Sequence, residues 1–268
     1  MSEETIQLRV HGAPDSPALI YLPGLHGDWT LVSSFRAAVR GQVRFVEFTY
    51  PRTVTWSLED YACAVISALS KNAIYSGWLI GESFSSQVAW QIADIAHRNR
   101  AASFLPHGII LAGGFARFPI PAGVRCARFV NGAMPAWMIR AGLKVYADYA
   151  RLRHRRAPET LACIDEFVAR RTEEDRQAML HRYGLILDSH AGEIACRSEL
   201  PVYALCGFVD PVVPWLWTLP WLRRNCPGFR DSRIILNADH NVLGTAPQRS
   251  AEQILKWIDV KTQSTRTR

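Results

Sequence analysis

A serine in the stretch Gly81-Glu82-Ser83-Phe84-Ser85 has the setting of a nucleophile. An apolar run ends at Gly81 and a segment with helical patterning begins at Ser86, so Ser83 is expected on a sharp strand-to-helix turn. Small residues two positions before and after Ser83 allow the strand and the helix to approach closely. The turn also brings the serine to a helix N-terminus, where negative charge is stabilised. The alternative interpretation of Ser83 is an ordinary helix N-cap.

A serine nucleophile needs a base, and the base needs an acid that orients it. Among the eight histidines, His240 is best placed, because it lies after a predicted strand and before the last predicted helix. Asp210 follows a predicted strand that ends near Cys206, so its carboxylate should enter the same crevice as Ser83. The adjacent Asp239 is expected to be structural. The alternatives for His240 and Asp210 are a loop histidine and a turn aspartate before proline.

Acyl-transfer chemistry also needs hydrogen-bond donors for a developing oxyanion. One donor is expected to be the backbone N–H of Phe84, at the start of its helix. The second is expected to be the N–H of Leu25, in a turn after an apolar run that ends at Leu22. Glycines on both sides of Leu25 allow this turn to fold tightly. His26, in the same turn, is interpreted either as a residue that contacts the substrate or as an exposed turn residue.

The elements that would position these residues alternate along most of the chain. Short apolar runs are followed by segments with helical periodicity, which is typical of a mostly parallel sheet with helices on both faces. Strands are predicted over residues 5–11, 18–22, 43–48, 78–81, 108–112, 202–206 and 233–236. Helices in this part of the chain are predicted over residues 29–40, 57–69, 86–97 and 246–260.

Residues 115–195 interrupt the alternation with an arginine-rich segment of helical pattern. A segment of about 80 residues exceeds any ordinary loop. We therefore expect an α/β core made of residues 1–114 and 196–268, interrupted by a helical cap over 115–195. Within the cap, helices are predicted over residues 135–149, 158–170 and 173–187.

The motifs and their order resemble the α/β-hydrolase superfamily, in its capped serine-esterase branch. The resemblance covers essentially the whole chain and implies a mostly parallel sheet flanked by helices, with a helical cap inserted after the sixth-strand region. It also implies the chain order nucleophile, acid, histidine. The matching segments are residues 23–29, 81–85, 210–214 and 239–240, with Pro23 where histidine is usual and Ser85 where glycine is usual, a mild crowding of the elbow.

The residues and the resemblance together predict a cofactor-free serine hydrolase that cleaves a carboxylic ester through an acyl-enzyme. Ser83 attacks the carbonyl, His240 moves the proton and Asp210 holds the imidazole. We expect no cofactor and no metal, since no cysteine or histidine cluster has the spacing of a zinc site. Thioesterase, C–C bond hydrolase, aminopeptidase and acyltransferase activities stay open. The alternatives are a hydrolase of esters or thioesters linked to an acyl carrier protein, and a hydrolase-derived receptor that binds a small ligand with little turnover.

Composition and charge narrow the class of protein further. A chain of 268 residues with 49% hydrophobic residues is not disordered, and its net charge of +7 raises the prospect of an anionic partner. The densest basic run, Arg151 to Arg156, is interpreted as a solvated helix face, with docking of an acidic carrier protein as the alternative. No nucleic-acid-binding module is recognisable. No apolar run reaches the roughly 18 residues of a membrane span, the N-terminus is acidic, and the scattered cysteines form no CxxC pair, so we expect a cytoplasmic protein.

Overall fold

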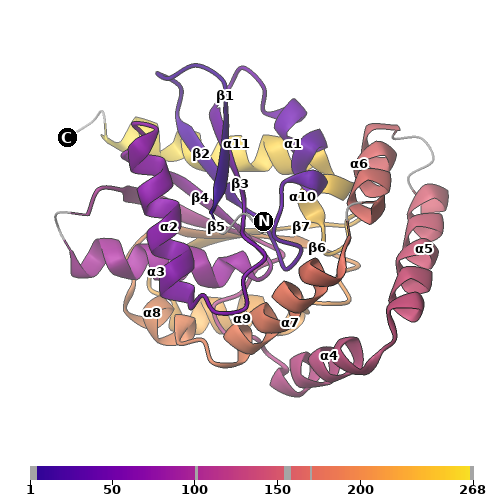
Figure 1. Cartoon of the computed structure of the whole chain (residues 1–268). Helices are drawn as coiled ribbons and strands as arrows, with labels where there is room; N and C mark the ends of the chain where they lie inside the picture. Colours follow the sequence, from indigo (N-terminus) through magenta and orange to yellow (C-terminus); the bar gives the residue numbers. More distant parts are fainter. Residues whose placement is uncertain (1–4, 100–101, 154–157, 170, 266–268) are drawn as a thin grey trace.

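One twisted sheet forms the centre of the molecule. The computed structural model describes residues 5–99, 102–153, 158–169 and 171–265. Within these ranges seven strands form a sheet in the order β1-β3-β2-β4-β5-β6-β7 (Figure 1). β1 pairs antiparallel with β3 and the other neighbours are parallel, so the predicted mostly parallel sheet is confirmed. The strands are β1 (Gln7–His11), β2 (Ala18–Leu22), β3 (Arg44–Thr49), β4 (Ser76–Glu82), β5 (Leu105–Ala112), β6 (Val202–Gly207) and β7 (Phe229–Ile235).

Helices cover both faces of the sheet, as the continuous apolar run of β2 predicts. Alternate side chains of a strand point to opposite faces, and alternate residues of β2 belong to two different clusters of buried hydrophobic side chains. The first cluster includes residues of α2 (Leu58–Lys71) and α3 (Ser85–Arg98), and the second includes residues of α1 (Ser33–Ala38) and α11 (Pro247–Thr265). The short helices η1 (Thr30–Val32) and α10 (Val242–Thr245) complete this layer.

The start of α2 follows the sequence closely. Ser57 is its N-cap, and the Ser57 hydroxyl accepts a hydrogen bond from the Asp60 N–H at 3.1 Å. The Asp60 carboxylate in turn accepts from the Ser57 N–H at 2.8 Å. This reciprocal pair satisfies two backbone donors that the helix itself leaves open, so the boundary of α2 is set by local chemistry.

Five helices lie between β5 and β6 in the described part of the chain. They follow the fifth strand in chain order, one strand earlier than the expected sixth-strand region. Figure 1 shows α4, α5 and α6 set to one side of the sheet, with α7 leading back toward it. α8 packs against α3 and contributes buried residues to the first hydrophobic cluster, which also contains residues of α2 and α3. The helices are α4 (Pro121–Ala133), α5 (Ala136–Arg153), α6 (Pro158–Ala169), α7 (Glu173–Leu187) and α8 (Ala191–Arg197).

The predicted basic run begins at the C-terminal end of α5. The Arg151 guanidinium lies 2.7 Å from the Asp148 carboxylate and 2.6 Å from that of Asp165, so its charge is paired at the surface. Residues 154–157 of the run lie outside the described residues. A docking role for this run therefore stays a prediction.

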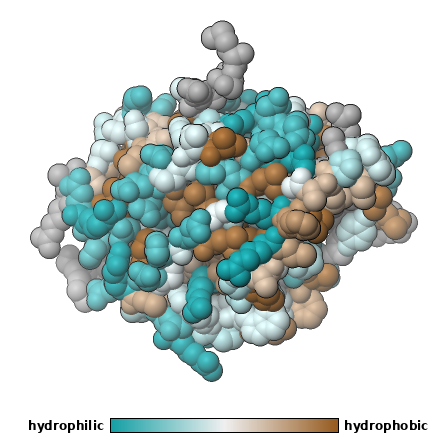
Figure 2. Space-filling view, turned by 60° about the horizontal axis from the view of Figure 1, so that its bottom comes forward, coloured by the Kyte–Doolittle hydropathy of each residue, from teal (hydrophilic) through white to brown (hydrophobic). Residues whose placement is uncertain are grey.

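None of the described helices is both long and apolar enough to cross a membrane. On the face of the molecule that Figure 2 shows, hydrophobic residues lie among hydrophilic ones.

Candidate active site

Ser83 lies on a strained turn between β4 and α3. Its φ of +49° is in the left-handed region, which non-glycine residues rarely adopt. The Ser83 N–H donates to the Ala112 carbonyl at 3.1 Å, which anchors the turn to β5. A Cβ on Gly81 would lie 2.7 Å from the Ser86 Cα, so this position requires glycine. The turn has the strand-to-helix geometry that the sequence predicts for a nucleophile at a strand end.

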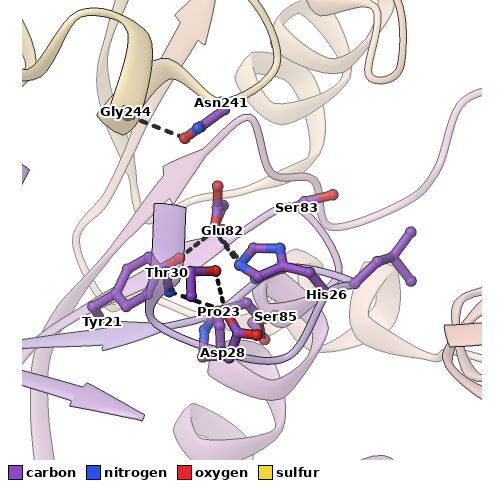
Figure 3. A network of polar contacts seen from close by, with 12 residues as sticks. Tyr21, Pro23, His26, Asp28, Thr30, Glu82, Ser83, Ser85, Asn241 and Gly244 are labelled. Carbon is purple, nitrogen blue, oxygen red and sulfur yellow. Dashed lines mark hydrogen bonds and ion pairs between the residues drawn. The ribbon is translucent and has the colours of Figure 1, made fainter. Parts of the chain in front are cut away.

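Ser85 does more than crowd the turn at the position where glycine was expected. Its side chain is fully buried, and its hydroxyl donates a hydrogen bond to the Pro23 carbonyl oxygen (Figure 3). The same hydroxyl lies 2.8 Å from the Tyr50 hydroxyl. Ser85 thus links the turn that carries Ser83 to the turn after β2. A glycine could not make this link, which gives a physical reason for the serine.

The structure brings the three predicted side chains together. Ser83 Oγ lies 2.8 Å from His240 Nε2, and His240 Nδ1 lies 2.9 Å from Asp210 Oδ2. The Asp210 side chain is 1% exposed. Its other oxygen accepts hydrogen bonds from the N–H groups of Val212 and Val213 at 2.8 and 2.9 Å. The carboxylate is therefore fixed, and it favours the tautomer in which Nδ1 carries the proton and Nε2 faces the serine.

The loops after β6 and β7 place Asp210 and His240 side by side. A Cβ on Gly207, at the end of β6, would lie 2.0 Å from the Asp239 carbonyl oxygen, so only glycine allows this approach. The Asp239 carboxylate accepts from the Asn241 N–H at 3.0 Å and from the Thr245 hydroxyl at 3.2 Å. These are turn-stabilising bonds within its own loop, in line with the structural role expected for Asp239.

Opposing effects act on the protonation of His240. Burial acts to lower its pKa, but the hydrogen bond to Asp210 and the negative charges of Asp210, Glu82 and Asp239 outweigh burial and raise the pKa above its usual 6.5. Only the neutral imidazole can accept a proton from Ser83. The relay is therefore in its working form only above that raised pKa.

The turn after β2 presents one predicted backbone donor, and the start of α3 presents the other. The Gly27 N–H donates to the Gly24 carbonyl at 3.0 Å. In a trans peptide the N–H points opposite to the carbonyl, so the Leu25 N–H is directed away from that bond. The Phe84 N–H lies at the N-terminus of α3. Within the described part of the chain neither N–H donates to another residue.

Two arginines from the helical segment hold the turn after β2 from outside. Arg182 of α7 is 2% exposed and donates to the Leu25 carbonyl at 2.8 Å. A Cβ on Gly27, whose φ is +80°, would lie 2.4 Å from Arg182 Nη1, so the turn and the guanidinium require glycine there. Arg171, between α6 and α7, donates to the His26 carbonyl at 3.2 Å and to the Asp28 carboxylate. Sequence patterns did not reveal either arginine, because backbone carbonyls far away in the chain leave no motif.

The Asp28 carboxylate, in the turn after β2, is mostly buried and forms an ion pair with Arg171. Burial acts to raise its pKa, but His26, Arg171 and hydrogen bonds from Thr30 lower it to about 2. Since a carboxyl in the unfolded chain titrates near 3.8, the charge of Asp28 stabilises the fold above that pH, and the stabilisation is lost as pH falls toward 2.

We therefore expect Asp28→Asn to lower the free energy of unfolding by about 2 kcal/mol at pH 7. At pH 3 the gap between the variant and the wild type should narrow by about 1 kcal/mol, because the wild-type carboxyl is then partly protonated in the unfolded state. Urea unfolding of both proteins at the two pH values measures this. A gap that is the same at pH 7 and pH 3 would contradict the pairing.

A cavity of about 750 Å³ lies over Ser83. His26 lines it with a side chain that is only 11% exposed, so the interpretation of His26 as an exposed turn residue is wrong. The His26 ring packs edge-on against Phe167 of α6, with ring centroids 5.7 Å apart. The apolar lining comes from the core and from the helical segment, and includes Leu25, Leu31, Leu143, Phe167, Met179, Tyr183, Val209 and Val212.

Solved structures share this fold across nearly the whole chain. Comparison of the sequence with family models and with curated proteins finds no match. A thermophilic esterase from Thermogutta terrifontis is 18% identical, with a TM-score of 0.72 over 95% of this chain and 93% of its own. The enol-lactonase from Burkholderia xenovorans is 16% identical, with a TM-score of 0.73 over 96% and 98%. An α/β-hydrolase from a deep-sea metagenome library of the Medee basin is 12% identical, with a TM-score of 0.71 over 95% and 94%. At these identities the likeness concerns the fold, and the chain has the fold of the α/β-hydrolase superfamily.

Proposed function

We propose that this protein is a serine hydrolase that cleaves a carboxylic ester through an acyl-enzyme. The observation that carries the proposal is the continuous relay from Ser83 Oγ through His240 to the buried Asp210, with distances of 2.8 and 2.9 Å. This relay starts from a serine on a strained turn at the head of a helix, which is the arrangement that activates a hydroxyl. The esterase and the enol-lactonase among the structural neighbours support ester cleavage at a general level.

The proposed reaction has two halves that use the same groups. Ser83 Oγ attacks the ester carbonyl while His240 Nε2 takes the hydroxyl proton, and the carbonyl oxygen becomes an oxyanion. Collapse of this intermediate expels the alcohol, which takes the proton from His240 and leaves the acyl group on Ser83. A water molecule, deprotonated by His240, then attacks the acyl carbon. The second collapse releases the carboxylic acid and restores the Ser83 hydroxyl.

The N–H groups of Leu25 and Phe84 are the donors proposed for the oxyanion. Both lie beside Ser83, Leu25 in the lining of the cavity and Phe84 next in the chain. Donors aimed at the developing charge stabilise the transition state more than the ground state.

The helical segment over residues 115–195 is proposed as a cap on a core of residues 1–114 and 196–268. Residues of α5, α6 and α7 line the cavity over Ser83, among them Leu143, Phe167 and Met179. A cap of this kind shapes the substrate pocket and excludes water from the reaction.

The cavity favours an uncharged substrate. The two arginines that line it already have carboxylate partners, Arg171 with Asp28 and Arg176 with Glu173. The described lining residues include no lysine and no further arginine that could receive an anion, and the acidic Glu82 is also among them. Burying an unpaired charge costs several kcal/mol, so an ester with a free carboxylate in its acyl chain should be excluded.

An ester pair matched in chain length tests both the activity and this selectivity. We expect p-nitrophenyl hexanoate to be hydrolysed with a kcat/KM at least about 100-fold above that of the p-nitrophenyl monoester of hexanedioic acid. Met179→Lys places a cation in the cavity and should reduce the ratio of the two kcat/KM values at least about tenfold.

Gln177→Lys is the matched control, because it adds the same charge to the same helix at an exposed position. It should leave the ratio unchanged. Equal turnover of both esters by the wild type would contradict the selectivity. Turnover of neither ester, with both bound, would favour the alternative of a receptor with little turnover. Hydrolysis of carrier-linked esters, docking of an acidic carrier protein and the cytoplasmic location stay predictions.

A further inference from the structure

Glu82 is a buried carboxylate that the proposed relay does not use. It is the last residue of β4, directly before Ser83, and its side chain is 6% exposed. Among the described residues no lysine or arginine lies within ion-pair distance of it. A buried carboxylate without a cation is costly unless hydrogen bonds satisfy it. The hydrogen bonds that the Glu82 carboxylate accepts therefore indicate its role.

One oxygen of Glu82 gathers contacts from the turn after β2 (Figure 3). Glu82 Oε2 accepts a hydrogen bond from the Tyr21 hydroxyl, and it accepts another from the Gly24 N–H at 3.2 Å. His26 Nε2 lies 3.9 Å from the same oxygen and has no hydrogen-bond partner in the described structure. The Glu82 carboxylate thus connects the end of β4, next to Ser83, with the end of β2 and with the turn that follows β2.

The two bonds at Gly24 fix its peptide groups on both sides. Its N–H is held by Glu82, and its carbonyl is held by the Gly27 N–H. The carbonyl belongs to the same peptide plane as the Leu25 N–H, so the direction of that N–H depends on both bonds.

We propose that Glu82 is a positioning residue, which fixes the turn carrying the Leu25 N–H relative to Ser83. The inference rests on the proposed ester hydrolysis. A displacement of about 1 Å in such a group can cost roughly 100-fold in rate, because the donor must meet the oxyanion as it forms.

The charge of Glu82 has a second, separable consequence. The charges of three carboxylates act on His240, and each raises the pKa of the imidazole: Asp210 after β6, Asp239 after β7 and Glu82 at the end of β4. Removing the Glu82 charge should lower that pKa. The neutral imidazole then persists to lower pH, so the acid limb of the pH–rate profile should shift to lower pH.

Two substitutions separate the hydrogen bonds from the charge. Glu82→Leu removes both, and we expect kcat on p-nitrophenyl hexanoate to fall about 10- to 100-fold with KM changed less than about threefold. Glu82→Gln keeps an acceptor for Tyr21 and Gly24 but removes the charge. We expect its kcat at high pH to stay within about threefold of the wild type, with the acid limb at lower pH. Rates are referred to active sites counted by a fluorophosphonate probe, so a loss of folded protein does not appear as a loss of kcat.

Tyr21→Phe keeps the test decisive if Glu82→Leu does not fold. It removes one donor to Glu82 and leaves the charge, so kcat should fall about three- to tenfold and the acid limb should not move down. The proposal is overturned if Glu82→Leu keeps the wild-type kcat and pH profile. It is also overturned if the single variant Glu82→Gln keeps the wild-type pH profile and the single variant Tyr21→Phe keeps the wild-type kcat. A wild type that neither hydrolyses esters nor reacts with the probe instead overturns the proposed function itself.

Discussion

Ser83→Ala should abolish ester hydrolysis, with a fall in kcat of about 10⁵- to 10⁶-fold on p-nitrophenyl hexanoate. Without the hydroxyl there is no nucleophile to form the acyl-enzyme, and only binding and the oxyanion donors remain to assist water. A fluorophosphonate probe measures the same property directly. Intact mass should show one adduct on the wild type and none on Ser83→Ala.

Ser67→Ala is the matched control for this experiment. Ser67 is an exposed serine on α2, so its loss should change neither the adduct nor the rate. An adduct that persists on Ser83→Ala would show that a different residue reacts. A folded wild type that takes no adduct would contradict an activated serine. Such a result would favour the alternative of a hydrolase-derived receptor that binds a small ligand with little turnover.

The sequence predicted the parts of the site that are set by local chemistry. Ser83, Asp210 and His240 each follow a strand whose apolar pattern is clear, and parallel strands bring their carboxyl ends to one edge of the sheet. The position of each residue after a predicted strand, together with the chain order that the family resemblance implies, therefore indicated which side chains would meet. The capping box of α2 was predicted in the same way, since its two partners, Ser57 and Asp60, are three residues apart.

What the sequence did not reveal depends on contacts between distant segments. Arg182 and Arg171 contact backbone carbonyls more than 140 residues away, and a carbonyl has no residue-type signature. The sequence assigned no role to Glu82, the residue before Ser83, because its partners become apparent only when β2 and β4 pair. Four of the described helices carry glycine or proline and were not predicted, because these residues weaken a helical pattern. These are α4, α8, α9 (Trp215–Asn225), which has Pro220 in its interior, and α10.

The same contacts connect the helical segment to the chemistry. The turn that carries the Leu25 N–H is held from inside by Glu82 and Ser85 and from outside by Arg171 and Arg182. A turn with so many independent restraints is preorganised, and preorganised donors need no rearrangement when charge develops. The proposed cap would then contribute to the oxyanion site as well as to the walls of the pocket.

Asp210→Asn should reduce kcat about 10³- to 10⁴-fold at a pH where the wild type is fully active. The amide can present N–H to the imidazole, which favours the tautomer with its proton on Nε2 and so removes the acceptor for the Ser83 hydroxyl. The substitution also removes the charge and the hydrogen bond that raise the pKa of His240, so the residual activity should have its acid limb at lower pH. A pH–rate profile of both proteins measures the two effects together.

Asp239→Asn separates the effect of charge from the effect of the hydrogen bond. Asp239 also raises the pKa of His240, but its carboxylate bonds to Asn241 and Thr245 within its own loop. Its removal should move the acid limb down slightly, and kcat should fall less than about tenfold, because the imidazole keeps its orientation. If Asp210→Asn were as mild as Asp239→Asn, Asp210 would act only as a nearby charge. A large loss confined to Asp210→Asn requires the direct bond to Nδ1, and with it the orientation of the base toward Ser83.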